Sequence, residues 1–517
     1  MRRLTGQVAF GCAKALHKVC TVAITAAVLV SVGLGAAAWR LSQAPWDLPW
    51  LTERLEAAVN SNGGPTRLSI GGVALAWEGF RRGVERSLEL RVSNVLLTDQ
   101  AGVRRMSVPR ADVSVSLFEL LLGRLAIRTV EVDDARLTIV RAADGTLNID
   151  MGDLTEPDPN PSPDATPMAD LLSELAQPAR TDRDLTNTLM GQLREVRVRD
   201  ARVTVIDRAL GVTWRAPQAE IDLVRHPTGG LEGTAELSLA LGDQRTHLSL
   251  AATLSPGGAG THLRARMTPF TPSALARSSP SLSALSALDA PVSGQASLDL
   301  DGHLGLRHLQ FDLHAAAGSA AIGKGKVLLS DAVLVGSATP DTVTVQTFRV
   351  TLPGRAAAPK THLETHGTVQ RSPDRISAAF SATLDQVEFA DLPAFWPQGV
   401  GGNAREWLLE NITAGTARDG HVEFGIEASP DLANVVLTRA TGTLDGTQLQ
   451  VHWLRPVPPI DHGRAQLRII DPDTLDIVVA GGRQVLRSQK SNEAGMQIRS
   501  GRMRITGLMQ PHQKCTI

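Results

Sequence analysis

Two segments of this chain, sixty-six positions apart, carry one pattern: Val130-Glu-Val-Asp-Asp-Ala-Arg-Leu-Thr-Ile-Val-Arg141 and Val196-Arg-Val-Arg-Asp-Ala-Arg-Val-Thr-Val-Ile-Asp207. In both, apolar residues alternate with polar ones around a central Asp-Ala-Arg, which predicts strand, Asx-type turn and strand. Two hairpins of similar composition can match by chance, but the shared triplet and the shared apolar phase favour a structural repeat. Stacked β repeats form elongated proteins. The segments therefore predict a mainly β, repeat-like and extended fold.

Period-two alternation continues over most of the chain. It runs through Leu88–Leu97 and, from Leu231 to Ile517, through short segments separated by Gly, Pro, Asp or Ser, with roughly twenty strands expected in all. Such antiparallel sheets have one apolar face and one solvated face. The residues that we predict to line the apolar face are Leu237, Leu239, Leu248, Leu250, Leu298, Leu300, Leu309, Phe311 and Leu313.

Only short helices interrupt the strands. The pattern predicts one from Asp47 to Asn60 with Asp47 as its cap, and one from Asn403 to Ile412 capped by Asn403. Two more are expected over 116–123 and 168–176. Residues 151–185 are rich in Pro, Asp and Ser, a composition that is typical of a linker.

A long uncharged segment, Val19–Trp39, precedes the strands. As a helix it would span about 30 Å, the thickness of a bilayer's hydrocarbon core. Basic residues before it and tryptophans after it predict a single-pass anchor with residues 1–18 in the cytoplasm. The length of the apolar run disfavours a cleaved signal peptide, and length together with the absence of a polar face disfavours a buried soluble helix. A lipoprotein signal is disfavoured because Cys20 precedes the apolar run instead of ending it. The predicted anchor residues are Val22, Ile24, Val28, Leu29, Val30, Leu34 and Trp39.

Composition disfavours several classes of function. The net charge is −1 and aromatic residues make up 3% of the chain, so neither a basic field nor stacking platforms for nucleic acid are expected. The three cysteines provide no disulfide framework for the body and no CxxC zinc site. His362-Leu-Glu-Thr-His366 departs from the HExxH order, and a solvated strand face is favoured over metal binding. We expect no catalytic residues, no metal and no cofactor.

The apolar face itself needs a cover, because a sheet stabilises the fold by burying that face against a second layer. With few helices available, the cover is either another sheet, as in a row of β-sandwiches, or an apolar ligand. Next to a membrane anchor, acyl chains are the obvious ligand. The residues alone leave both possibilities open.

Several blocks resemble a known family. Leu90–Gly102, Ser116–Ile139 and Asp144–Asn148, which follow the apolar segment, resemble the N-terminal module of AsmA-like proteins. The blocks that resemble the YhdP branch of that family are Leu392-Pro-Ala-Phe-Trp-Pro397, Ala404–Ile412, Val451-His-Trp-Leu-Arg-Pro-Val-Pro-Pro-Ile460 and Ser500–Leu508. Their order along the chain supports the resemblance more than any single motif does.

The resemblance implies a bridge-like lipid-transfer protein. Its organisation would be a cytoplasmic segment (1–18), a transmembrane anchor (19–39), an AsmA-like β module (40–150), a linker (151–185) and a periplasmic β-groove (186–517). Such a groove shields phospholipid acyl chains between the inner and outer membranes and contributes to outer-membrane integrity. The resemblance also implies a longer chain than this one, so we expect a fragment or a truncated product. A scaffold for outer-membrane proteins that carries no lipid is the alternative, with an enzyme as a distant third.

Overall fold

The computed structural model describes residues 25, 28, 31–33, 35–36, 39–40, 44–60, 66–77, 88–99, 104–115, 127–150, 166–167, 172–173, 175–178, 193–242, 244–256, 259–355, 359–398, 402–430, 434–452, 455–485, 495–508 and 514–516. Among these residues, no helix has the length and apolar character needed to cross a membrane. Of the predicted anchor residues, Val28 and Trp39 are helical and exposed. Val22, Ile24, Leu29, Val30 and Leu34 lie outside the described residues, as does the helix expected over 116–123.

The fold is mainly β, as predicted, with more strands than expected. The strands before the first long connection are β1 (Trp46–Asp47), β2 (Thr66–Trp77), β3 (Leu88–Asp99), β4 (Arg104–Val115), β5 (Ile127–Asp133), β6 (Arg136–Arg141), β7 (Leu147–Asp150), β8 (Thr166–Pro167), β9 (Glu195–Asp207), β10 (Val212–Arg225), β11 (Leu231–Leu241), β12 (Gln244–Leu254) and β13 (Thr261–Phe270). The later strands are β14 (Leu288–Asp289), β15 (Val292–Leu300), β16 (Leu306–Ala315), β17 (Gly318–Ile322), β18 (Gly325–Leu329), β19 (Asp331–Ala338), β20 (Thr342–Leu352), β21 (Thr361–Arg371), β22 (Ile376–Glu388), β23 (Ile412–Ala428), β24 (Val435–Val451), β25 (Ile460–Asp471), β26 (Thr474–Ala480), β27 (Arg483–Gln484), β28 (Met496–Gln497), β29 (Ser500–Thr506) and β30 (Lys514–Thr516). The helices are α2 (Pro49–Asn60), α5 (Pro272–Ala276), η3 (Pro280–Ala287), η4 (Phe389–Asp391), α6 (Leu392–Phe395) and α7 (Gly402–Asn411).

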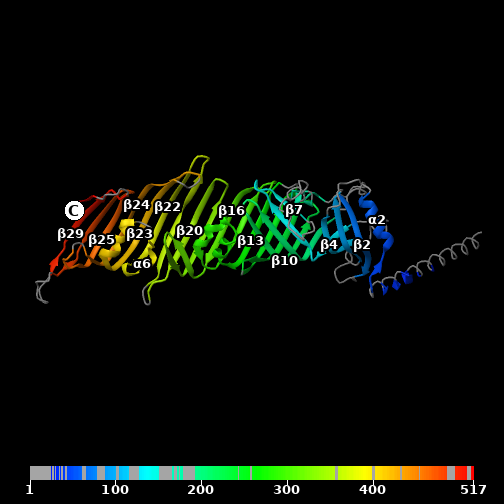
Figure 1. Ribbon diagram of the computed structural model, residues 1–517, viewed down its shortest axis with the longest axis horizontal. Helices are drawn as coiled ribbons and strands as arrows, with labels where there is room; N and C mark the ends of the chain where they lie inside the picture. The colour runs from blue at the N-terminus through cyan, green and yellow to red at the C-terminus, as the bar shows by residue number, and fades with distance from the viewer. Residues whose placement is uncertain are drawn as a thin grey trace, which may run out of the picture.

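One 27-stranded sheet contains every strand except β14, β17 and β18, which form a small sheet of their own. From β9 to β26, successive strands of the large sheet pair antiparallel with their neighbours in chain order. The strands therefore stack along the long axis of the molecule, with α2 and β2 near one end and β29 near the other (Figure 1). The linker at 151–185 does not divide this sheet, because β9 pairs directly with β5 and β6.

The repeated segments lie side by side at this junction. β9 runs parallel to β5 and β6, and Val130 lies opposite Val196 just as Arg136 lies opposite Arg202. Each residue thus pairs with its equivalent sixty-six positions on. The expected Asx-type turn is wrong. The central aspartates adopt left-handed φ angles that kink the strands without reversing them, and the alanine after each one, Ala135 and Ala201, is buried.

The strand ends form two different rims. Between β9 and β26, antiparallel pairing places alternate connections on opposite rims, and one rim carries short turns there, such as those after Leu300 and Ala338. The other carries the longer connections that contain α5, η3, β14, β17, β18, η4, α6 and α7. The helices α6 and α7 pack through Phe395 and Leu408 against a buried cluster that includes Ala417. Most of the helices therefore lie at one rim, whereas Leu172 and Leu175 pack against the cluster of Leu231 and Leu254 at the other.

Both expected helix caps are wrong. The first helix begins at Pro49, and Asp47 lies in β1 opposite Ala74. The helix near the C-terminal third begins at Gly402, so Asn403 lies inside it. The helices expected over 47–60 and 403–412 are themselves present, and Leu172, Ser173 and Leu175 within the linker are helical.

Candidate functional site: an uncovered apolar face

The register of the large sheet places apolar residues in rows that cross the strands. Row 1 contains Ala235, Leu250, Ala265, Ala296, Phe311, Gly336, Val345, Gly367, Phe380, Phe424 and Ala440, each directly opposite the next. Row 2 contains Leu237, Leu248, Met267, Gly294, Leu313, Leu334, Phe348, Thr365, Ala382, Val422 and Gly442. Row 3 contains Gly233, Ala252, Leu263, Leu298, Leu309, Ala338, Val343, Val369, Ala378, Ile426 and Leu437. None of these residues is charged.

Seven of the nine predicted face residues belong to these rows. Leu250 and Phe311 lie in row 1, Leu237, Leu248 and Leu313 in row 2, and Leu298 and Leu309 in row 3. The other two lie outside the rows. Leu239 packs on the cluster around Ala201, and Leu300 is the last residue of β15. The sequence pattern identified the strands and the face, and the register was needed to assemble the rows.

Protein does not cover this face along the middle of the sheet. Row residues are half-buried or exposed, with only Gly336 and Ala440 fully buried. Within the described residues, the four buried apolar clusters draw their members from outside β13–β21. Phe348, at 38% exposure, shows how open the face is for a large aromatic side chain. A β-sandwich would bury these residues against a second sheet, and the only second sheet in the described part of the chain is the three-stranded one of β14, β17 and β18.

The opposite face of the same strands is polar. A hollow on that face is lined by Thr234, Glu236, Ser249, Arg264, Arg266, Gln295, Ser297, Gln310, Asp312 and Gln346 beside the backbone of row 1. Both of its carboxylates accept hydrogen bonds, because Ser249 Oγ donates to Glu236 at 2.6 Å and Gln295 Nε2 donates to Asp312 Oδ2 at 3.5 Å. The hollow is thus lined mostly by polar side chains, with the apolar residues Ala251 and Val335 among them, and lies on the face opposite the apolar rows.

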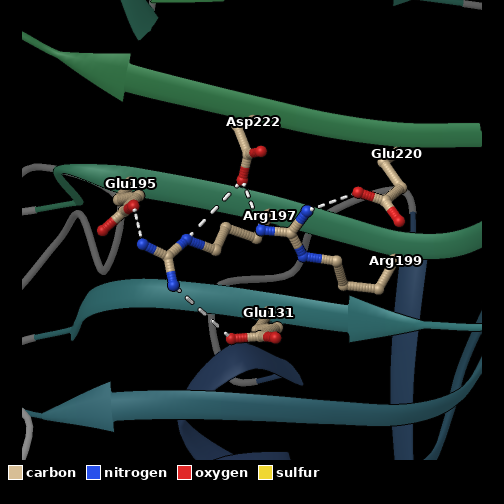
Figure 2. Close-up of polar contacts among 6 residues, drawn as sticks. All are labelled: Glu131, Glu195, Arg197, Arg199, Glu220 and Asp222. Atoms are coloured by element: carbon tan, nitrogen blue, oxygen red, sulfur yellow. Dashed lines mark hydrogen bonds and ion pairs between the residues drawn. The ribbon is translucent and has the colours of Figure 1, made fainter. Parts of the chain in front are cut away.

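A charged cluster on the polar face holds the repeat junction together (Figure 2). Arg197 lies 2.5 Å from Glu195, 3.6 Å from Asp222 and 3.9 Å from Glu131. Arg199 lies 3.0 Å from Asp222 and 3.1 Å from Glu220. These contacts join β5, β9 and β10, and the guanidinium groups balance half-buried carboxylates. The cluster acts as a structural tie.

Several carboxyl groups elsewhere have shifted pKa values, among them Asp112 and Asp476. Burial raises the pKa of Asp112, which lies opposite Glu131 in the register. Arg504 and Arg502 donate hydrogen bonds to Asp476, and these bonds hold the pKa of Asp476 well below its usual range. Neither carboxyl lies in the apolar rows.

The histidine motif at 362–366 lies on β21, as expected. Glu364 accepts two hydrogen bonds from Arg349, and His362 Nδ1 lies 3.2 Å from Thr351 Oγ1. No group of three His, Cys, Asp or Glu side chains with metal-binding geometry occurs among the residues that the structure describes.

Comparisons of the chain with protein-family models, curated proteins and solved structures found no match. The functional argument therefore depends on the rows themselves, together with the resemblance noted from the sequence.

Proposed function

We propose that this protein binds lipid acyl chains along the apolar face of its sheet and contributes to phospholipid transport between an inner and an outer membrane. The observation that carries the proposal is the continuity of rows 1 to 3 from β11 to β24 without a charged residue, with most row residues half-buried or exposed. A conduit needs such continuity, whereas a scaffold tolerates Arg or Asp on the same face.

The driving force would be apolar burial. An acyl chain that lies against the rows removes apolar surface from water, and each Å² contributes about 25 cal/mol. Because the rows cross the strands, a chain can move along the long axis of the sheet and exchange one set of similar contacts for the next. Such a surface holds lipid without a single tight site.

The proposed setting is periplasmic. The uncharged segment at 19–39 would anchor the chain in the inner membrane, with residues 1–18 in the cytoplasm and the sheet on the other side. Phospholipid acyl chains and components of the outer membrane would be the partners.

Photo-crosslinking in cells tests the proposal on the intact chain. A photoreactive amino acid is placed in turn at five successive positions of β16, Leu309 to Leu313, and adducts are analysed for lipid. We expect lipid adducts at Leu309, Phe311 and Leu313 and none at Gln310 and Asp312, since side chains alternate between faces. Adducts at all five positions, or at none, would contradict lipid binding on this face. The absence of lipid from a folded chain would favour the scaffold.

A further inference from the structure

Glycines of the apolar face lie directly opposite large side chains. The register pairs Gly233 with Leu223, Gly294 with Leu313, Gly336 with Phe311, Gly367 with Phe380, and Gly442 with Val422. All five pairs are cross-strand neighbours. Because glycine has no side chain, the larger residue of each pair has free space beside it on the same face.

The large side chains occupy that free space. A β-carbon on Gly336 would lie 2.6 Å from Cζ of Phe311, and one on Gly294 would lie 2.6 Å from Cδ2 of Leu313. These separations are far below van der Waals contact, so the tip of each side chain rests over the glycine. Only glycine permits this approach.

The aromatic rings of Phe311 and Phe380 therefore lie close to the surface of the sheet. The ring of Phe311 extends along the sheet toward β19 instead of standing upright. Phe380 likewise lies beside Gly367, and its ring stacks on Phe424 with centroids 5.5 Å apart. Phe348 provides the contrast, because its cross-strand neighbours are Leu334 and Thr365, and it is exposed.

We infer that Gly336 and Gly367 are positioning residues that hold the rings of Phe311 and Phe380 flat against the sheet. They thereby keep row 1, which lies between rows 2 and 3, open for the passage of acyl chains. The inference rests on the proposed function. A lipid that moves along the long axis must cross β16, β19 and β22 in turn. A ring that stood up at any of these strands would lie across its path.

The inference is tested by enlarging the ring of Phe311. The glycines themselves are left unchanged, because a side chain there would also clash with neighbouring backbone oxygens. The space over Gly336 holds a phenyl ring but is closed on its far side by Val345, the next residue of row 1. The larger indole of Phe311→Trp does not fit there. The indole should therefore stand away from the sheet. Phe348→Trp is the matched control, because it adds the same atoms to the same face beside non-glycine neighbours.

The readout is lipid crosslinking in cells from two reporter positions of the full chain, Leu248 on one side of Phe311 and Ile426 on the other. Phe311→Trp should lower the adduct at one reporter at least tenfold relative to the other, while Phe311→Leu and Phe348→Trp leave the ratio of the two unchanged. Equal effects of Phe311→Trp and Phe348→Trp, or no effect of either, would overturn the inference.

Two further outcomes separate this inference from the proposed function. A wild-type chain that gives no lipid adduct at either reporter contradicts the proposed function itself. Lipid adducts at both reporters in the wild type, with an unchanged ratio in Phe311→Trp, leave lipid binding intact and contradict only the role of the flat ring. The protein level and its resistance to proteolysis in each variant show whether the sheet has folded.

Discussion

A carboxylate in the middle of row 3 should separate lipid binding from folding. Leu309 lies between Leu298 and Ala338 on the apolar face, is half-buried and belongs to none of the buried clusters. Leu309→Asp should therefore cost about 1 kcal/mol of the free energy of unfolding or less, as expected for a site outside a core. By contrast, Leu449→Asp places an unpaired charge in a core cluster where the side chain is 3% exposed, and should cost about 4 kcal/mol or more.

The effect on lipid should be measurable at this position. Full burial of a leucine side chain contributes about 1.5–3 kcal/mol, and because Leu309 is already half-buried, the lipid contact that Leu309→Asp removes is worth about half of that. At about 1.4 kcal/mol for each tenfold change, bound lipid should fall roughly 3-fold to 10-fold at limiting lipid. Gln310→Asp adds the same carboxylate to the opposite face and should leave the lipid content unchanged.

The assay is lipid extraction and mass spectrometry of each purified variant, with urea denaturation as the measure of stability. Equal lipid content in Leu309→Asp and Gln310→Asp would refute the assignment of the two faces. Global unfolding of Leu309→Asp would refute the claim that this part of the face is uncovered.

Three further predictions concern the sheet itself. Arg197→Ala leaves three half-buried carboxylates without their common partner and should lower the free energy of unfolding by about 1–3 kcal/mol in urea titrations, whereas Arg439→Ala, which removes one exposed ion pair, should cost less than about 1 kcal/mol. Because arginines depress the folded-state pKa of Asp476, its contribution to stability should be complete above about pH 4, the unfolded value, and should disappear as the pH falls toward the folded one. In thermal melts, Asp476→Asn should reduce the fall in melting temperature between neutral and acid pH. A pH dependence of the melting temperature equal to that of the wild type would contradict this role of Asp476. Ala201→Leu should overpack a fully buried site and lower the free energy of unfolding by about 1–3 kcal/mol. Ala251→Leu, at an exposed position on the polar face, should change the melting temperature little.

Local patterns predicted the strands well. Alternation is a property of neighbouring residues, so Leu88–Leu97 and the segments around Leu309 could be assigned as strands with one apolar face. The helices α2 and α7 were also expected, because Leu51 and Leu408 belong to patterns typical of helices that pack on a sheet, whereas α5, η3, η4 and α6 were not expected.

Features that depend on distant pairing could not be predicted. The sequence similarity around Ala135 and Ala201 indicated a repeat, but nothing local indicates that two repeated strands will pair parallel and in register. The same limit applies to Leu300, which has the right periodicity but lies at the end of β15. The glycines that leave space beside Phe311 and Phe380 lie on other strands. Only the register of the sheet shows that these glycines adjoin the rings.

The cap assignments failed for a different reason. Asp47 and Asn403 are favourable cap residues, and propensity placed them at the helix starts. In the structure, pairing of Asp47 with β2 takes precedence, and the second helix begins one residue earlier at Gly402. Tertiary pairing determines such boundaries more strongly than the preference of a single side chain.

The most direct test of the account is to express the body of the protein from Ala44 onward, without the apolar segment, and to count the lipids that co-purify with it. Circular dichroism establishes that the body is folded and mainly β, and a soluble β protein of similar size, purified in parallel, gives the background. The account predicts several phospholipids per chain above that background. A folded body that carries no lipid above the control would contradict it.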